Sequence, residues 1–458
     1  IERKATQKSQ SIQSGSMTKK LILIAMSGVR IVDPELRALG MTLPGFIERG
    51  KVIASMPSLG LLTIAGATPD SWQIKYREVD ELQPEILPKI IAEAPDLVAI
   101  SSLSARIEDA YQIADTLRQA KIPVVMGGLH ASVLPAEVSA HCDAVVLGQG
   151  EWVWPDLLRD LESGHLKPQY SGMHAPNALE STPLPRFDLL EVARYNRIPM
   201  QTTRGCPLDC IFCAASRLIS PYKLKSLDRI RDELNAIQSI WPDPFIELAD
   251  DNTFRNKGWS RDLVNLLSEY PTMRWFTETD LSLADDEALL ESLTRSGCAQ
   301  VLIGFESVQE DSLQDTDTRS WKRKRLAEYR EKIQRIQSAG ISVNGCFIFG
   351  FDADTEETFD RTWEFIQKSD LSEVQLTLLT PFPGTELYRK LRAENRLLED
   401  RFWSKCTLFD VVFHPKYFSP ERLSERFREM VSLVYSPEAT QKRASLRTKI
   451  YRSKVSKS

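Results

Sequence analysis

The sequence lacks an apolar run long enough to cross a bilayer. A membrane-spanning helix needs about 20 consecutive apolar residues, and no stretch of the 458 residues approaches that length. No apolar secretory segment precedes Met17, and residues 1–16, rich in Gln, Ser and Lys, are interpreted as a leader outside the fold. We therefore expect a cytoplasmic protein without a transmembrane segment.

An extracellular disulfide framework is not indicated either, because the seven cysteines are an odd number. Four of them fall in or beside apolar segments, where buried free thiols are common: Cys142, Cys298, Cys346 and Cys406. This usage favours a reducing compartment.

Charge of one sign is not in excess, since 58 Lys and Arg residues face 63 Asp and Glu residues. A balance of this kind does not favour nucleic acid as a partner. The exception is the tail from residue 441 to 458, whose charged residues are all basic. We expect a solvated terminus there, with contact to nucleic acid or anionic lipid as the alternative.

Residues 17–164 alternate short apolar segments with stretches whose apolar residues recur at helical spacing. Five such strands predict a parallel, doubly wound α/β sheet. Ligands of these sheets bind at the carboxyl ends of the strands, where this chain has small, polar loops. The predicted strands are Leu21–Ala25, Ile74–Val79, Leu97–Ile100, Val124–Met126 and Ala144–Leu147.

A second alternating series covers residues 196–388 and predicts a partial (β/α)6 barrel, with its chemistry at the carboxyl ends of the strands. Residues 165–195 between the two series lack periodicity and are expected to form a linker. Residues 389–458 are expected to form a helical C-terminal region with the basic tail. The predicted barrel strands are Met200–Thr203, Phe245–Ala249, Trp275–Thr279, Gln300–Phe305, Ser342–Phe349 and Glu373–Thr380.

Three cysteines within eight residues, Cys206, Cys210 and Cys213, follow the first of these strands. Thiolates are the usual ligands of iron–sulfur clusters, and three of them can hold three corners of a [4Fe–4S] cube and leave one iron open. Structural zinc almost always takes four ligands, and the nearest downstream cysteine is Cys298. A zinc site or a redox thiol group is therefore the weaker interpretation.

The Cys-x3-Cys-x2-Cys spacing, with Phe212 before its last cysteine, resembles the signature of the radical S-adenosylmethionine (AdoMet) enzymes. The resemblance implies that AdoMet chelates the open iron through its amino and carboxylate groups. Ile303–Ser307 is similar to the family segment that contacts the ribose, and Asn344–Gly350 resembles the segment that cradles the adenine. The AdoMet-side residues that it implies are Phe212, Asp251, Asn252, Glu278, Glu306, Ser307, Gly345 and Phe347.

Asp250–Phe254 departs from the Gly-Gly-Glu type of motif that the family often has after its second strand. An acidic segment at this place looks like the cobalamin-linked branch of the family. The alternative is a helix N-cap by Asp251 or Asn252. The turn Thr380–Thr385 also resembles a segment of that branch, where substrate could enter, and its alternative is a rigid turn.

The region 17–164 resembles the cobalamin-binding module that precedes many of these barrels. The run Asp-x-His-x-x-Gly is missing after the first strand, which implies that the cobalt receives no histidine from that loop. A domain that keeps the fold without cobalamin is the alternative. The implied contacts are Ser58, Leu59, Gly60, Ser101, Ser102, Gly127, Gly128, His130, Gly148, Gln149, Gly150 and Glu151.

Together these resemblances imply a cobalamin-dependent radical AdoMet methyltransferase that acts on an unactivated carbon of a small-molecule or lipid-like substrate. An electron donor such as flavodoxin or ferredoxin is expected as a partner. Two alternatives use the same barrel: a cyclase or oxidoreductase with both cofactors, and a radical AdoMet enzyme whose cobalamin domain is vestigial. A scaffold protein that uses the cluster structurally is the alternative of a different class.

Overall fold

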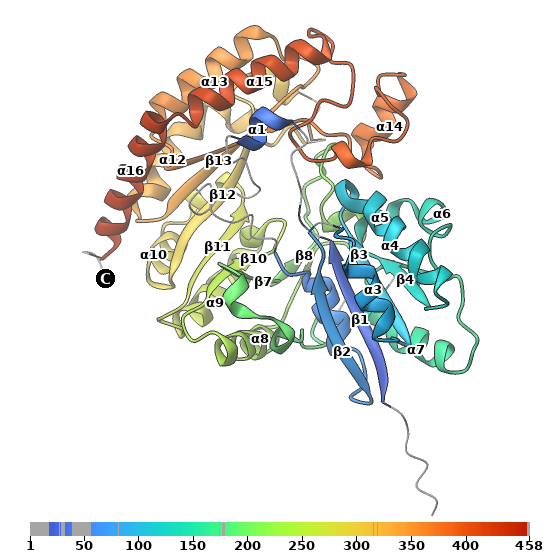
Figure 1. The fold of residues 1–458 in the computed structure, drawn as a ribbon. Coiled ribbons are helices and arrows are strands. Elements are labelled where there is room, and N and C mark those ends of the chain that lie inside the picture. The colour runs from blue at the N-terminus through green and yellow to red at the C-terminus, as the bar shows by residue number, and fades with distance from the viewer. Residues whose placement is uncertain are drawn as a thin grey trace, which may run out of the picture.

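The computed structural model describes residues 18–26, 28, 33–38, 56–80, 82–173, 175, 179–314, 316–317 and 319–455. Two α/β units stand side by side, and the C-terminal region contacts both of them (Figure 1). The leader predicted at residues 1–16 lies outside the described residues. None of the described helices is both long and apolar enough to span a membrane.

The first unit is a parallel sheet whose strands are β1 (Lys19–Met26), β2 (Trp72–Glu78), β3 (Leu97–Ser102), β4 (Val124–Gly127), β5 (Ala144–Gly148) and β6 (Gln169–Gly172). The strands lie in the order β2-β1-β3-β4-β5-β6. Side chains of β1 alternate between two apolar clusters, with Leu21 and Leu23 in one and Ile22 and Ile24 in the other. Both faces are therefore buried, which is why these strands are continuous apolar runs.

Helices cover both faces of this sheet. The cluster on one face includes α2 (Leu59–Gly66) and α7 (Trp154–Glu162). The cluster on the other includes α3 (Ile86–Ala92), α4 (Ile107–Gln119), α5 (Leu129–Val133) and α6 (Pro135–Val138). β6 is a correction to the sequence analysis, because it pairs with β5 inside the segment expected to be a linker.

The second unit is an open parallel sheet in the order β14-β13-β12-β11-β10-β7. Its strands are β7 (Ile198–Met200), β10 (Phe245–Leu248), β11 (Arg274–Thr279), β12 (Cys298–Glu306), β13 (Ser342–Phe349) and β14 (Glu373–Leu378). The helices along its outer side are α8 (Leu227–Ile240), α9 (Lys257–Ser268), α10 (Glu287–Arg295), α12 (Tyr329–Ser338) and α13 (Glu356–Lys368). The short helix α11 (Glu310–Leu313) follows β12. β7 and β14 are the two edges of the sheet, so the predicted partial barrel is confirmed.

The C-terminal region holds the first unit against the barrel. It contains α14 (Glu386–Ala393), α15 (Pro420–Val434) and α16 (Pro437–Val455). Trp403 lies in the same apolar cluster as Ile22 and Ile24, and its ring nitrogen donates to Glu137 of α6 at 3.0 Å. A second contact joins the N-terminal part of the chain to this region. Asp33, which precedes the short helix α1 (Pro34–Ala38), pairs with Arg428 of α15 at 3.0 Å.

The turn Thr380–Thr385 also belongs to this junction. A Cβ at Gly384 would stand 2.6 Å from Val133 of α5, and Gly384 has a φ of +85°. Thr385 caps α14 by accepting from the backbone of Tyr388 at 3.1 Å. The structure therefore places this segment as a rigid turn packed on the first unit.

The basic tail is not the freely solvated terminus that we expected, at least over its described part. It forms α16, where Arg447 donates to the backbone of Ser372 at 2.9 Å and pairs with Glu373 at 2.6 Å. The Arg274 guanidinium at the start of β11 lies 5.9 Å from the ring centre of Tyr451. α16 therefore packs against the amino ends of the barrel strands.

Replacing Arg447 by Ala should loosen α16, because the Glu373 carboxylate loses a charged donor worth about 1.5–3 kcal/mol. We expect faster amide hydrogen exchange in residues 437–455 of the variant. The matched control is Lys449→Ala, since Lys449 is exposed on the same helix. Equal exchange in both variants would contradict this role of Arg447.

Candidate active site

The three cysteines predicted to bind a cluster lie on the loop between β8 (Thr203–Arg204) and β9 (Lys223–Leu224), which pair as an antiparallel hairpin. All three are free and partly buried. Gly205 opens the loop with a φ of +78°, and a Cβ there would meet Pro221 O at 2.6 Å. Glycine is therefore required at the point where the chain turns into the loop.

Backbone hydrogen bonds tie this loop to two other parts of the barrel. Ile211 N donates to Thr316 O at 3.0 Å, and Leu387 N of α14 donates to Ile211 O at 3.0 Å. Phe212 packs edge-on against Phe351, which follows β13, with ring centres 5.9 Å apart. The loop is thus fixed at its centre, between its second and third cysteines.

A [4Fe–4S] cube takes each of three thiolates on a different iron. Among the described residues, no group of three His, Cys, Asp or Glu side chains is placed to hold one metal ion. Burial raises the pKa of Cys210 to about 11 and that of Cys213 to about 12, so both thiols are protonated without a metal, and metal binding releases their protons.

Asp250, at the end of β10, anchors the hairpin. Its buried carboxylate accepts from Thr202 N at 2.7 Å, from Thr203 N at 2.9 Å and from the hydroxyl of Thr253 at 3.0 Å. These bonds hold the strand that leads into the cysteine loop. The position of the loop therefore depends on a charge that is fully enclosed by hydrogen bonds.

Several residues predicted on the AdoMet side lie together at the mouth of the barrel. Asn252 donates to Asp280 at 2.9 Å, and Asp280 also pairs with Arg255 at 2.8 Å. Asp251 and Asp280 both lie within electrostatic reach of the Cys206 thiol. Asn252 therefore acts within a polar network beside the cysteine loop and does not cap a helix by a side-chain hydrogen bond.

Glu278 of β11 faces the inside of the barrel, opposite to Trp275 in the helix-side core. Its side chain is accessible to solvent but lies among other acids. Its pKa is raised to about 8, first by desolvation and then by the charges of Glu247, Asp251 and Glu306. Crowded carboxylates favour a cation, and the sulfonium of AdoMet carries a positive charge.

Glu306 lies at the mouth of the barrel, at the irregular end of β12. The register shifts between Gly304 and Glu306, and Glu306 has a φ of +63°. Its carboxylate accepts from Lys322. Ser307 accepts from Gln309 N at 3.1 Å, so its hydroxyl stabilises the turn that follows.

The side chain of Phe347 lies on the helix side of β13. It is fully buried among the helix-side residues of the barrel, and its ring stacks on Phe305 with centres 5.7 Å apart. Gly345 faces the same side, because a Cβ there would stand 2.8 Å from Leu371. The residues of β13 that alternate with them, and so face the barrel interior, are Asn344, Cys346 and Ile348, which sequence reasoning missed.

A pocket of about 310 Å³ opens at the carboxyl ends of β3, β4 and β5. Gly128 and Gly148 turn there with φ values of +99° and +68°. A Cβ at Gly150 would contact Val146 at 3.1 Å and Ile64 at 3.3 Å, which both line the pocket. The predicted cofactor residues that line it are Leu59, Gly60, Ser101, Gly127, Gly128, Gly148, Gln149, Gly150 and Glu151.

This pocket fits part of a large, flat cofactor. Its wall on the sheet side is apolar, with Ala99, Val125 and Val146, and glycines form its rim. The amide nitrogen of Gln149 is buried there without a hydrogen-bond partner. An apolar slot with a few unpaired polar groups is the usual form of a small-molecule site, and it suits a corrin ring with amide side chains.

Three predicted contacts do not line the pocket. His130 is 1% exposed, and its ring lies 2.9 Å from the Ser104 hydroxyl and edge-on to Trp403. Burial lowers its pKa, which favours a neutral core histidine. Ser58 instead caps α2, and Ser102 donates to Leu103 O at 3.0 Å.

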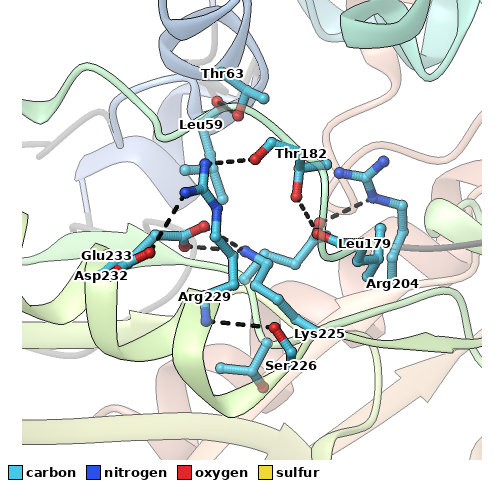
Figure 2. A network of polar contacts seen from close by, with 12 residues as sticks. Leu59, Thr63, Leu179, Thr182, Arg204, Lys225, Ser226, Arg229, Asp232 and Glu233 are labelled. Carbon is cyan, nitrogen blue, oxygen red and sulfur yellow. Dashed lines mark hydrogen bonds and ion pairs between the residues drawn. The ribbon is translucent and has the colours of Figure 1, made fainter.

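The opposite wall of the pocket comes from the barrel and was not predicted (Figure 2). Arg204 donates to Gln149 at 2.9 Å and pairs with Glu151 at 2.6 Å. Further along, Lys225 pairs with Glu233 at 2.8 Å, with both side chains at most 5% exposed. The segment around Thr182 closes this wall, because Thr182 O accepts from Arg229.

Family models match three consecutive parts of the chain. Residues 49–158 match the B12 binding domain, residues 200–366 match the Radical SAM superfamily, and residues 385–458 match a domain of unknown function (DUF4070). SAM is another abbreviation of AdoMet. The fold and the site thus define a radical SAM enzyme with a B12-binding domain.

Curated relatives extend over most of the chain. It is 30% identical over 407 residues to bacteriochlorophyllide d C-12(1)-methyltransferase of Chlorobaculum tepidum, covering 87% of this chain and 86% of that protein. It is 25% identical to hopanoid C-2 methylase of Rhodopseudomonas palustris, with 86% and 78% covered. It is 24% identical to anaerobic magnesium-protoporphyrin IX monomethyl ester cyclase of Rubrivivax gelatinosus, with 71% and 64% covered.

Among solved structures, the radical S-adenosylmethionine methyltransferase TsrM from Kitasatospora setae, with cobalamin and a [4Fe-4S] cluster bound, has the same fold. The TM-score is 0.69 at 14% identity, covering 96% of this chain and 100% of that one. The chain belongs to the family of cobalamin-dependent radical SAM methyltransferases. Its cofactors are a [4Fe–4S] cluster, AdoMet and cobalamin, as the sequence predicted.

Replacing Cys206, Cys210 and Cys213 together by Ala should abolish the broad iron–sulfur absorbance, because no thiolate remains to hold the cube. The fold should survive, since Asp250 and Ile211 still anchor the loop. Iron and sulfide analysis measures the cluster content, and circular dichroism measures the fold. The matched control is the buried Cys298→Ala, and stoichiometric iron in the triple variant would contradict the assignment.

Gly150→Trp should fill the pocket and prevent cobalamin uptake, because its Cβ would already lie 3.1 Å from Val146 and 3.3 Å from Ile64, closer than an ordinary van der Waals contact. Equilibrium dialysis against cobalamin tests this. Gly258→Trp is the control, since Gly258 is exposed on α9 and a Cβ there would make only an ordinary contact, 3.8 Å from Asn256 Oδ1. Cobalamin bound equally by both variants would place the corrin elsewhere.

Proposed function

We propose that this enzyme methylates an unactivated carbon of a largely apolar, polycyclic small molecule. The observation that supports this most is the wall shared by the two cofactor sites. Arg204 lines the pocket, bonds to Gln149 and Glu151, and stands two residues before Cys206. We infer that both sites open toward one space between the units, where one substrate carbon can reach both cofactors.

The proposed chemistry divides between cofactors and protein. When bound, the cluster with AdoMet supplies a radical that takes hydrogen from the substrate carbon, and cobalamin supplies the methyl group. The residues of this chain position these groups: Asp250 and the backbone of Ile211 hold the loop, and the acids around Glu278 favour the AdoMet cation. The glycine rim lets a flat ring approach the backbone closely.

The substrate class in this proposal rests on the relatives. Bacteriochlorophyllides and hopanoids are both large, polycyclic and mainly apolar, and the chain is similar to a methyltransferase of each. The predicted contact residues that line the pocket or the barrel mouth, the domain division near residue 165 and a flavodoxin or ferredoxin as electron donor belong to the same proposal. A ring-forming or oxidative reaction is the second candidate, because a cyclase is also among the relatives.

Isotope labelling distinguishes these candidates. Reconstituted enzyme is incubated without oxygen with reductant, methyl-deuterated AdoMet and a panel of chlorophyllides and hopanoids. We expect release of 5′-deoxyadenosine and a product that carries the deuterated methyl group, and neither from the triple cysteine variant. Release of 5′-deoxyadenosine with a dehydrogenated or cyclised product that lacks deuterium would favour the second candidate and contradict methyl transfer.

A further inference from the structure

Lys322 is a buried cation at the mouth of the barrel, in the segment that follows α11. It is 7% exposed, and its ammonium donates to Gly304 O at 3.0 Å and to the Glu306 carboxylate. A buried ion pair stabilises a fold less than an apolar pair of the same volume usually does. Its presence here calls for a reason other than stability.

The local backbone is shaped around this pair. A Cβ at Gly304 would stand 2.4 Å from the Glu306 oxygen and 3.0 Å from the Lys322 nitrogen, so a larger residue would force this ion pair to move. The register shift after Gly304 and the left-handed φ of Glu306 turn the carboxylate toward the lysine. Residues other than glycine adopt such a φ only where the surroundings compensate for the strain.

The same segment touches the cysteine loop. Thr316 O accepts from Ile211 N, one residue after Cys210. The ammonium of Lys322 also lies within electrostatic reach of Cys210, because each of the two groups shifts the pKa of the other. Lys322 therefore contacts the residue predicted to bind the AdoMet ribose, and it lies in a segment whose backbone is hydrogen-bonded to the cysteine loop.

We propose that Lys322 is a positioning residue of the cluster and AdoMet site, which fixes the Glu306 carboxylate for AdoMet and holds a positive charge beside the iron bound by Cys210. This inference rests on the proposed cluster and AdoMet contacts. Reduction adds one negative charge to the cluster. A fixed cation in a site of low dielectric stabilises the reduced form and so raises the reduction potential.

The effect of the Lys322 charge on the cluster is tested by redox titration of the reconstituted enzyme. The electron paramagnetic resonance signal of the reduced cluster reports the reduced fraction. In Lys322→Met the ratio of reduced to oxidised cluster at a fixed potential should fall about tenfold, equivalent to about 59 mV for one electron. Lys322→Arg should restore the potential. Lys324→Met is the matched control, because Lys324 is exposed two residues further on, and it should leave the potential unchanged.

Glu306→Gln should shift the reduction potential in the opposite direction and raise the reduced fraction, because it leaves the Lys322 charge unbalanced beside the cluster. Opposite shifts in the two variants cannot come from general damage to the fold. AdoMet affinity, measured by equilibrium dialysis on the oxidised enzyme, should fall at least several-fold in Lys322→Met. Shifts of the same sign, or an unchanged potential and affinity in Lys322→Met at full iron content, would overturn the proposal.

If Lys322→Met does not take up the cluster, the reduction potentials of Lys322→Arg and Glu306→Gln test the proposal instead. A potential unchanged from wild type in Glu306→Gln overturns it. These measurements use no substrate. A failure of methyl transfer leaves them unaffected, so the two proposals fail separately.

Discussion

The anchoring of the cysteine loop is the constraint on which the rest of the site depends. Asp250 holds the hairpin that leads into the loop, and Ile211 is bonded on one side to Thr316 and on the other to Leu387. Leu387 belongs to the C-terminal region, which also packs on the first unit. The position of three thiols is thereby linked to the position of the pocket, because one set of contacts orients both units.

Acidic and basic side chains lie in different parts of this junction. The barrel mouth holds carboxylates that raise the pKa of Glu278, whereas the barrel side of the pocket presents Arg204 and Lys225, each paired with an acid. Pairs of this kind orient side chains more than they stabilise the fold. An acidic mouth suits the AdoMet cation, and the fixed ion pairs keep the pocket wall rigid.

Much of the fold could be predicted from the sequence because strands buried on both faces leave continuous apolar runs, as Leu21–Ala25 does. β6 could not, since this edge strand alternates exposed and buried residues and contains only one large apolar side chain, Tyr170. The direction of the Phe347 side chain, toward the helix-side core, could not be predicted because a motif match does not establish which face of a strand is inside. Arg204 was missed because its partners lie more than 50 residues earlier in the chain, and no local pattern reports such a contact.

The central claim is that the cluster and cobalamin face one shared opening. The most direct test is the electron paramagnetic resonance of enzyme that holds cob(II)alamin together with the [4Fe–4S] cluster. If the two sites share the wall formed by Arg204, reduction of the cluster should visibly speed the spin relaxation of the cobalt. A cobalt signal that is the same whether the cluster is oxidised or reduced would contradict the account.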